Sequence, residues 1–70
     1  MKSFYNKCEV EINAVYVLPA KRMLTPCVEI RCENITKPYW LTTKETFKSA
    51  GEAELFGAMM AREWIDENVK

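Results

Sequence analysis

The pattern of hydrophobic and polar residues is most regular in the last third of the chain, where it predicts one long amphipathic helix over residues 50–68. Apolar residues recur there at helical spacing and form one stripe. The stripe consists of Ala53, Phe56, Gly57, Met60, Ala61 and Trp64. Ser49 stands where an N-cap is expected, and Glu52 follows three residues later, as in a capping box. We therefore expect the helix to bury this stripe against the rest of the chain.

Leu55 and Met59 lie outside this stripe, and Ala58 and Ile65 lie toward its flank. A helix that buries only one face is expected to be polar on the opposite face. We therefore expect Leu55 and Met59 to be covered either by a sheet that curves around the helix or by another chain. Gly57 costs about 1 kcal/mol relative to alanine at a mid-helix position. It indicates a close approach of the helix to a sheet, with a hinge or a gap for a ligand as the alternative.

The region before the helix alternates between apolar and polar residues with a period of two, which is typical of half-buried strands. Residues 8–18 alternate in this way, and Val15 and Val17 fall on the otherwise polar side. This end of the strand is therefore apolar on both faces, which makes it a second candidate contact surface. Pro19 lacks an amide hydrogen and ends the strand pairing.

Residues 25–33 and 39–48 show the same pattern and are predicted to be the second and third strands. The short connections between the strands favour antiparallel pairing. The outward side of the third strand carries Trp40 and Lys44, and Lys44 is placed to pair with Glu29 across the strands.

The order strand, strand, strand, helix predicts an α+β fold within a single domain, residues 1–70. The simplest arrangement is a three-stranded antiparallel β-meander with one C-terminal α-helix packed across one face, β-β-β-α. A competing interpretation starts the helix near Thr43, because the sequence Thr43-Lys44-Glu45-Thr46 also resembles a cap. We prefer the later start, since the earlier one would place Gly51 inside the helix.

The charges balance, since ten Lys and Arg residues are matched by ten Asp and Glu residues. A dedicated nucleic-acid-binding domain usually has a basic excess or a basic patch, and a neutral protein has little electrostatic protection against self-association. No stretch approaches the length of a transmembrane helix, and residues 1–7 contain no apolar signal-peptide core. These features predict a cytoplasmic protein that does not contact a membrane.

Three cysteines, Cys8, Cys27 and Cys32, occur without any histidine and without a CxxC motif. Their spacing matches no zinc motif, and the lack of histidine excludes a cysteine–histidine nucleophile. The usual interpretation is reduced thiols that behave as small apolar residues. Cys8 and Cys32 fall on the same side of neighbouring strands, so a disulfide between them is conceivable if their Cα atoms lie within about 7 Å.

The last part of the chain contains the segments Thr46-Phe47-Lys48-Ser49, Glu52-Ala53, Ala61 and Trp64-Ile65-Asp66. Together they resemble the ending of certain short bacterial proteins, some of which are grouped as HlyU-like. The resemblance consists mostly of helix patterning. It implies the β-β-β-α order and a bacterial source, and it brings no catalytic motif and no function with it.

These features predict a small, non-catalytic protein-interaction module that self-associates, most simply as a homodimer, or that binds another protein. The surplus apolar residues and the zero net charge support this interpretation. The candidate interaction residues are Val15, Val17, Lys21, Arg22, Trp40, Leu55 and Met59. We expect no catalytic, cofactor-binding or metal-binding residues, because the chain has no histidine, no glycine-rich phosphate loop and a core too small for a deep pocket.

The alternative is a nucleic-acid-binding domain that uses the exposed face of the sheet and the loop with Lys21 and Arg22. Trp40 would serve as a stacking platform for a base. The first two strands carry several glutamates on that face against one arginine, Arg31, whereas a sheet that binds DNA needs outward Arg and Lys residues. A solvated loop is the simpler interpretation of Lys21 and Arg22.

Overall fold

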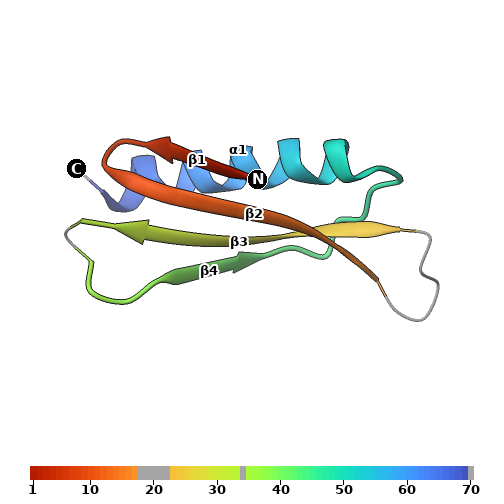
Figure 1. Ribbon diagram of the computed structural model, residues 1–70, viewed down its shortest axis with the longest axis horizontal. Helices are drawn as coiled ribbons and strands as arrows, with labels where there is room; N and C mark the ends of the chain where they lie inside the picture. The colour runs from red at the N-terminus through yellow and green to blue at the C-terminus, as the bar shows by residue number, and fades with distance from the viewer. Residues whose placement is uncertain (18–22, 34, 70) are drawn as a thin grey trace.

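The computed structural model describes residues 1–17, 23–33 and 35–69. Four antiparallel strands form one sheet in the order β1-β2-β3-β4, and one helix follows them. The elements are β1 (Lys2–Tyr5), β2 (Cys8–Tyr16), β3 (Leu24–Cys32), β4 (Tyr39–Thr42) and α1 (Ala50–Asn68). Figure 1 shows α1 running along one side of the sheet, in line with the long strands β2 and β3. The predicted α+β class, an antiparallel sheet followed by one C-terminal helix, is confirmed.

The prediction of three strands is wrong, because β1 adds a fourth strand at the edge of the sheet. β1 pairs with β2 through a two-residue turn that places Tyr5 opposite Cys8. Both turn residues have positive φ angles, 47° at Asn6 and 66° at Lys7, as in the type I′ turn whose twist suits a hairpin. Asparagine tolerates this conformation but lysine disfavours it. The pair Asn6-Lys7 therefore lacks the Asn-Gly signal by which such a hairpin is usually recognised.

β4 ends at Thr42, so the predicted third strand is wrong over residues 43–48. The hydroxyl of Thr43 accepts a hydrogen bond from the backbone amide of Glu45 at 3.2 Å. Such a local bond satisfies the backbone in a turn and takes the chain out of the ladder. The chain rejoins β3 at Phe47, which exchanges two backbone hydrogen bonds of 2.7 Å with Leu24. Lys44 consequently lies in a turn and not on a strand opposite Glu29.

β2 and β3 form the centre of the sheet. Their register places three inward pairs opposite each other, Cys8 with Cys32, Val10 with Ile30, and Ile12 with Val28. Cys8 and Cys32 form a disulfide between the two strands, with Cα atoms 4.0 Å apart. The expectation of reduced thiols is therefore wrong for this pair, and Cys27 is the free cysteine of the described residues.

The core lies between α1 and the inward side of β2 and β3. Its buried apolar residues are Cys8, Val10, Ile12, Val28, Ile30, Cys32, Ala53, Ala61 and Ile65. α1 faces the sheet with Ala53, Gly57, Ala61 and Ile65, so the buried stripe is rotated away from Phe56 and Met60. The small side chains let the helix backbone come close to the strands, and Ile65, which was expected at the flank, is fully buried.

Larger side chains hold the two long edges of α1. Toward β4, Trp64 stacks on Tyr39 with ring centroids 4.5 Å apart. Phe56 and Phe47 pack at 5.2 Å on the same side. Toward β1, the hydroxyl of Tyr5 donates a hydrogen bond to Asp66 Oδ1 at 2.6 Å. These contacts secure both edges of α1 against the sheet. The N-cap prediction is also confirmed, since Ser49 Oγ accepts a hydrogen bond from the Glu52 amide at 3.2 Å.

Gly57 marks the position where the helix backbone approaches the sheet without room for a side chain. A Cβ there would lie 2.8 Å from Ile12 Cγ2 and 3.1 Å from both Pro26 Cβ and Val28 Cγ2. These atoms belong to branched or cyclic side chains that cannot swing away. Overpacking of this kind typically costs about 1–3 kcal/mol, against a gain in helix propensity of about 1 kcal/mol. We expect Gly57→Ala to lower the free energy of unfolding in urea, and Gly57→Val to lower it further.

Gly51 provides the matched control, because a Cβ at this exposed position would meet nothing within 4 Å. We expect Gly51→Ala to leave the free energy of unfolding unchanged or to raise it by up to about 1 kcal/mol. Equal effects of alanine at both glycines would contradict the close approach at Gly57.

The disulfide between Cys8 and Cys32 closes a loop with a sequence separation of 24 residues. Constraining the unfolded chain in this way typically contributes about 2–4 kcal/mol. We expect a reductant to lower the free energy of unfolding by that amount, and Cys27→Ser to change it little. Thiol titration of the unfolded protein should count one thiol before reduction and three after it. Three thiols before reduction would show that the two half-cystines are not paired.

Candidate functional site

The apolar residues predicted to make contacts lie on two opposite sides of the molecule. Leu55 and Met59 lie on the side of α1 that faces away from the sheet, and they are 69% and 60% exposed. Val15 and Trp40 are also exposed, but they lie on strands whose inward residues face α1. Because side chains alternate along a strand, Val15 and Trp40 point away from the helix. One flat contact surface therefore cannot contain both pairs.

Three other predicted interaction residues add little to either side. Val17 follows the end of β2 and is half-buried. Lys21 and Arg22 lie outside the described residues.

The exposed side of α1 has a regular composition. Five exposed residues follow one another along it at intervals of three, four, three and four residues, and we call them the outer stripe. The outer stripe consists of Glu52, Leu55, Met59, Arg62 and Asp66. Its two apolar residues are adjacent and its three charged residues stand at the ends. The sheet does not curve around α1 to cover Leu55 and Met59, which leaves the other expectation, a second chain, as the possible cover.

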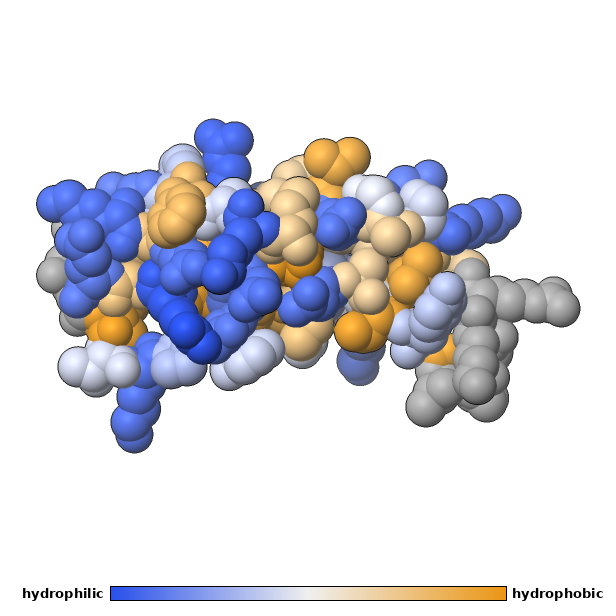
Figure 2. Space-filling model, in the orientation of Figure 1, coloured by the Kyte–Doolittle hydropathy of each residue, from blue (hydrophilic) through white to orange (hydrophobic). Residues whose placement is uncertain are grey.

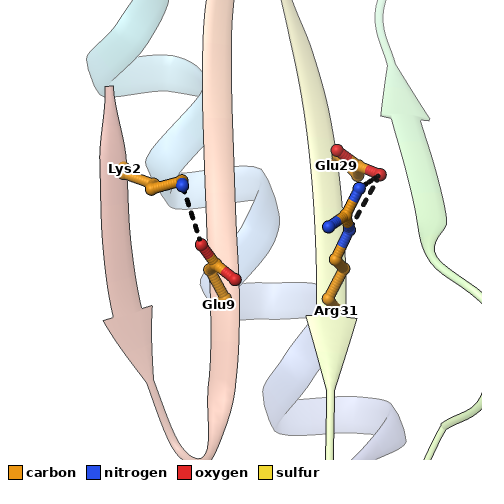
Figure 3. Close-up of polar contacts among 4 residues, drawn as sticks. All are labelled: Lys2, Glu9, Glu29 and Arg31. Carbon is orange, nitrogen blue, oxygen red and sulfur yellow. Dashed lines mark hydrogen bonds and ion pairs between the residues drawn. The ribbon is translucent and has the colours of Figure 1, made fainter.

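The outward face of the sheet carries a charged cluster instead of an apolar surface. Lys2 and Glu9 pair across β1 and β2, with Nζ and Oε1 3.2 Å apart. Arg31 pairs with Glu29 on β3, and its Nε and Nη2 atoms donate to Glu29 Oε2 at 3.1 and 2.9 Å. Figure 3 shows the two pairs side by side on neighbouring strands. With Glu11 beside them, two cations meet three carboxylates, so the cluster has one net negative charge.

The sequence predicted that Glu29 lies on the outward face of the sheet, but it did not predict that Glu29 is buried. It is 8% exposed, whereas the Arg31 side chain is largely exposed. The hydrogen bonds to Glu29, followed by the charge of Glu29, raise the pKa of Arg31, while its own desolvation acts in the opposite direction. Glu29 also stands opposite Trp40 in the register. Periodicity predicts to which side of the sheet a side chain points, but not which neighbouring side chains cover it.

Figure 2 shows hydrophilic residues gathered over the part of the strands nearest the β1–β2 turn. Over the middle and the other end of this side of the molecule, hydrophobic and hydrophilic residues are interleaved. This view agrees with a solvated, charged sheet face.

A groove of about 320 Å³ lies between β1 and α1. Its lining is mostly apolar and includes Val10, Ala58, Ala61 and Ile65, with the guanidinium of Arg62 at one side. Arg62 already lies over the ring of Tyr5, 5.1 Å from the centroid. The lining residues contain no nucleophile beside a general base, so the groove offers a place for an apolar group but no acid–base chemistry.

No group of three or more His, Cys, Asp or Glu residues is placed to hold a metal ion in residues 1–17, 23–33 and 35–69. Within the same described residues, no helix is both long and apolar enough to cross a membrane.

Comparison of the chain with protein-family models, curated proteins and solved structures gave no match. The resemblance to HlyU-like proteins therefore stays a prediction. The function is therefore inferred from the surfaces described above.

The two ion pairs of the charged cluster should differ in their effect on stability. Arg31→Gln leaves Glu29 as a nearly buried carboxylate without its two charged hydrogen bonds, which is costly. Lys2→Gln breaks a pair that is open to solvent on both sides, and such pairs contribute little. We expect Arg31→Gln to lower the melting temperature clearly more than Lys2→Gln does. Adding Glu29→Gln to Arg31→Gln should recover part of the loss, and equal melting temperatures for the two single variants would contradict this.

Proposed function

We propose that this protein is a small, non-catalytic interaction module that self-associates, and that its contact surface is the outer stripe of α1. The supporting observation is the pair Leu55 and Met59, which lie one helical turn apart and are both more than half exposed. Burying apolar surface contributes about 25 cal/mol per Å², and nothing in the described part of the chain covers these two side chains. A second copy would cover them with its own Leu55 and Met59.

The overall charge of the protein does not oppose such an assembly. The formal net charge is zero, so two copies approach without long-range repulsion. Two-fold symmetric dimers are the most common assemblies of a single kind of chain. With two apolar residues from each copy the contact is small, so we expect a weak dimer rather than an obligate one.

A cytoplasmic location and reduced thiols were both expected from the sequence. The structure pairs Cys8 with Cys32, and structural disulfides form mainly in oxidising environments. Self-association through α1 does not depend on which environment holds the protein.

Nucleic-acid binding through the outward face of the sheet has less support. Lys2 and Arg31 are engaged by glutamates and the charged cluster is net negative, whereas phosphate contacts need free cations. Trp40 is 57% exposed and has a face on which a base can stack, but one aromatic residue opposite Glu29 is a poor platform for a polyanion. Lys44, which was expected to add charge to this face, lies in the turn after β4.

The proposed surface can be tested with a variant that carries both Leu55→Ser and Met59→Ser. Both side chains are exposed, so the fold and the melting temperature should change little. The self-association seen by sedimentation velocity from micromolar to millimolar concentration should weaken by about tenfold or more, because the loss of two buried apolar contacts per copy exceeds 1.4 kcal/mol.

Val15→Thr is the matched control. It replaces a methyl group by a hydroxyl on an exposed apolar residue on the opposite side of the molecule, and we expect it to leave self-association unchanged. A wild-type protein that stays monomeric at millimolar concentration would refute the proposal, as would a dimer that is indifferent to the Leu55 and Met59 changes.

A further inference from the structure

The outer stripe has the spacing of a coiled-coil seam. Its residues recur at intervals of three and four, which is the a and d spacing of a heptad. Glu52, Met59 and Asp66 take one of these positions, and Leu55 and Arg62 take the other. Any single face of a helix repeats in this way, so the orientation of a partner helix depends on the order of charged and apolar residues along the stripe.

Resting on the proposed self-association, we infer that two copies pair through antiparallel α1 helices, with the two-fold axis at the level of Gly57. Residues equally distant from position 57 then face each other. Leu55 of one copy lies opposite the partner's Met59, and Met59 lies opposite the partner's Leu55. Glu52 lies opposite the partner's Arg62 at each end of this apolar centre. The four apolar side chains are thus flanked by two pairs of opposite charge.

A parallel pairing is disfavoured by the same residues. Two parallel helices in register place each seam residue opposite its own copy. Glu52 would then face the partner's Glu52, Arg62 the partner's Arg62 and Asp66 the partner's Asp66. Like charges in direct opposition are unfavourable, and three such levels would surround only two apolar ones.

Other antiparallel registers mix apolar and charged residues. Sliding one helix by one heptad toward its C-terminal end places Met59 opposite the partner's Arg62 and Leu55 opposite the partner's Asp66. Sliding it by one heptad in the other direction places Glu52 opposite the partner's Leu55, and the other stripe residues then extend beyond the partner's helix. The register centred at position 57 is therefore the one in which apolar residues meet apolar residues and each facing charge meets its opposite.

The fold leaves room for this pairing. α1 forms one outer layer of the protein (Figure 1), and the outer stripe is exposed along its whole length. Residues 50–64 of each copy fall within the overlap of the two helices. Arg62 now lies over the Tyr5 ring, but it is exposed and long enough to turn toward a neighbouring carboxylate. Asp66 stays engaged with the Tyr5 hydroxyl at the end of the stripe.

Charge reversal tests the register directly. Glu52→Arg alone places two arginines opposite each other at both ends, and Arg62→Glu alone places two glutamates there. We expect each variant to weaken self-association by about tenfold or more, since two attractive pairs become two repulsive ones. An equimolar mixture of the two variants should form a heterodimer, because each end then joins an arginine to a glutamate. The protein that carries both changes should regain the wild-type affinity. Glu67→Arg, an equal change of charge outside the outer stripe, should leave the affinity unaltered.

A distance measurement decides the orientation without altering these charges. Asn68→Cys in the Cys27→Ser background carries a single site for a spin label while the Cys8–Cys32 disulfide is kept. Residue 68 lies 11 positions beyond the axis in each copy, so the antiparallel dimer separates the two labels by about 33 Å. A parallel dimer brings them to about 10 Å.

The outcomes separate the register from the proposed function. If wild type self-associates through Leu55 and Met59, but the labels lie near 10 Å or the two charge variants fail to recover affinity when mixed, the register is wrong and the interaction module stands. If wild type remains monomeric at millimolar concentration, both fall. Circular dichroism of each variant shows whether a loss of affinity comes from unfolding. If it does, the label distance alone decides between the antiparallel and the parallel dimer.

Discussion

The structure depends on the close approach of α1 to the two central strands. At Gly57 the helix backbone lies against Ile12, Pro26 and Val28 without space for a Cβ atom. Ala53 and Ala61, one turn away on either side, continue this contact, and Ile65 completes it with a large buried side chain. Because small residues let the backbone come close, the rotation of α1 is set by its smallest side chains. That rotation turns the residues on the opposite side, Leu55 and Met59, fully outward.

The sequence predicted the class of fold because the spacing of apolar residues changes sharply near Ser49. Before it the period is about two residues, as in strands, and after it about 3.6 residues, as in a helix. It missed β1 because four residues are too few to show a period, and because Lys7 occupies a conformation that usually requires glycine. It extended β4 too far because residues 43–48 continue the alternating pattern of a strand. That pattern does not show that the Thr43 hydroxyl closes a turn by accepting from the Glu45 amide.

The candidate surfaces were only partly predictable, for a related reason. Periodicity shows that a residue leaves the buried face, but it does not show which other residues lie beside it in space. Leu55 and Met59 were recognised as surplus because a helix has a fixed geometry. Val15 and Trp40 were grouped with them although the fold separates the two pairs by its full thickness. The ion pair between Arg31 and Glu29 joins residues of a single strand, and no cross-strand pattern could have identified it.

The two faces of α1 follow from different physical demands on one sequence. The inner face has small residues at Ala53, Gly57 and Ala61, because the helix backbone lies close to the sheet there. The outer face alternates intervals of three and four, a spacing that keeps a row of side chains aligned along the whole length of the helix. Every helix face has this alignment, but a solvated face has no need of Leu55 and Met59, because charged residues alone would serve it better. A small domain buries a modest fraction of its surface, so covering this row by a second copy is a direct way to add to a core of which α1 already forms one side.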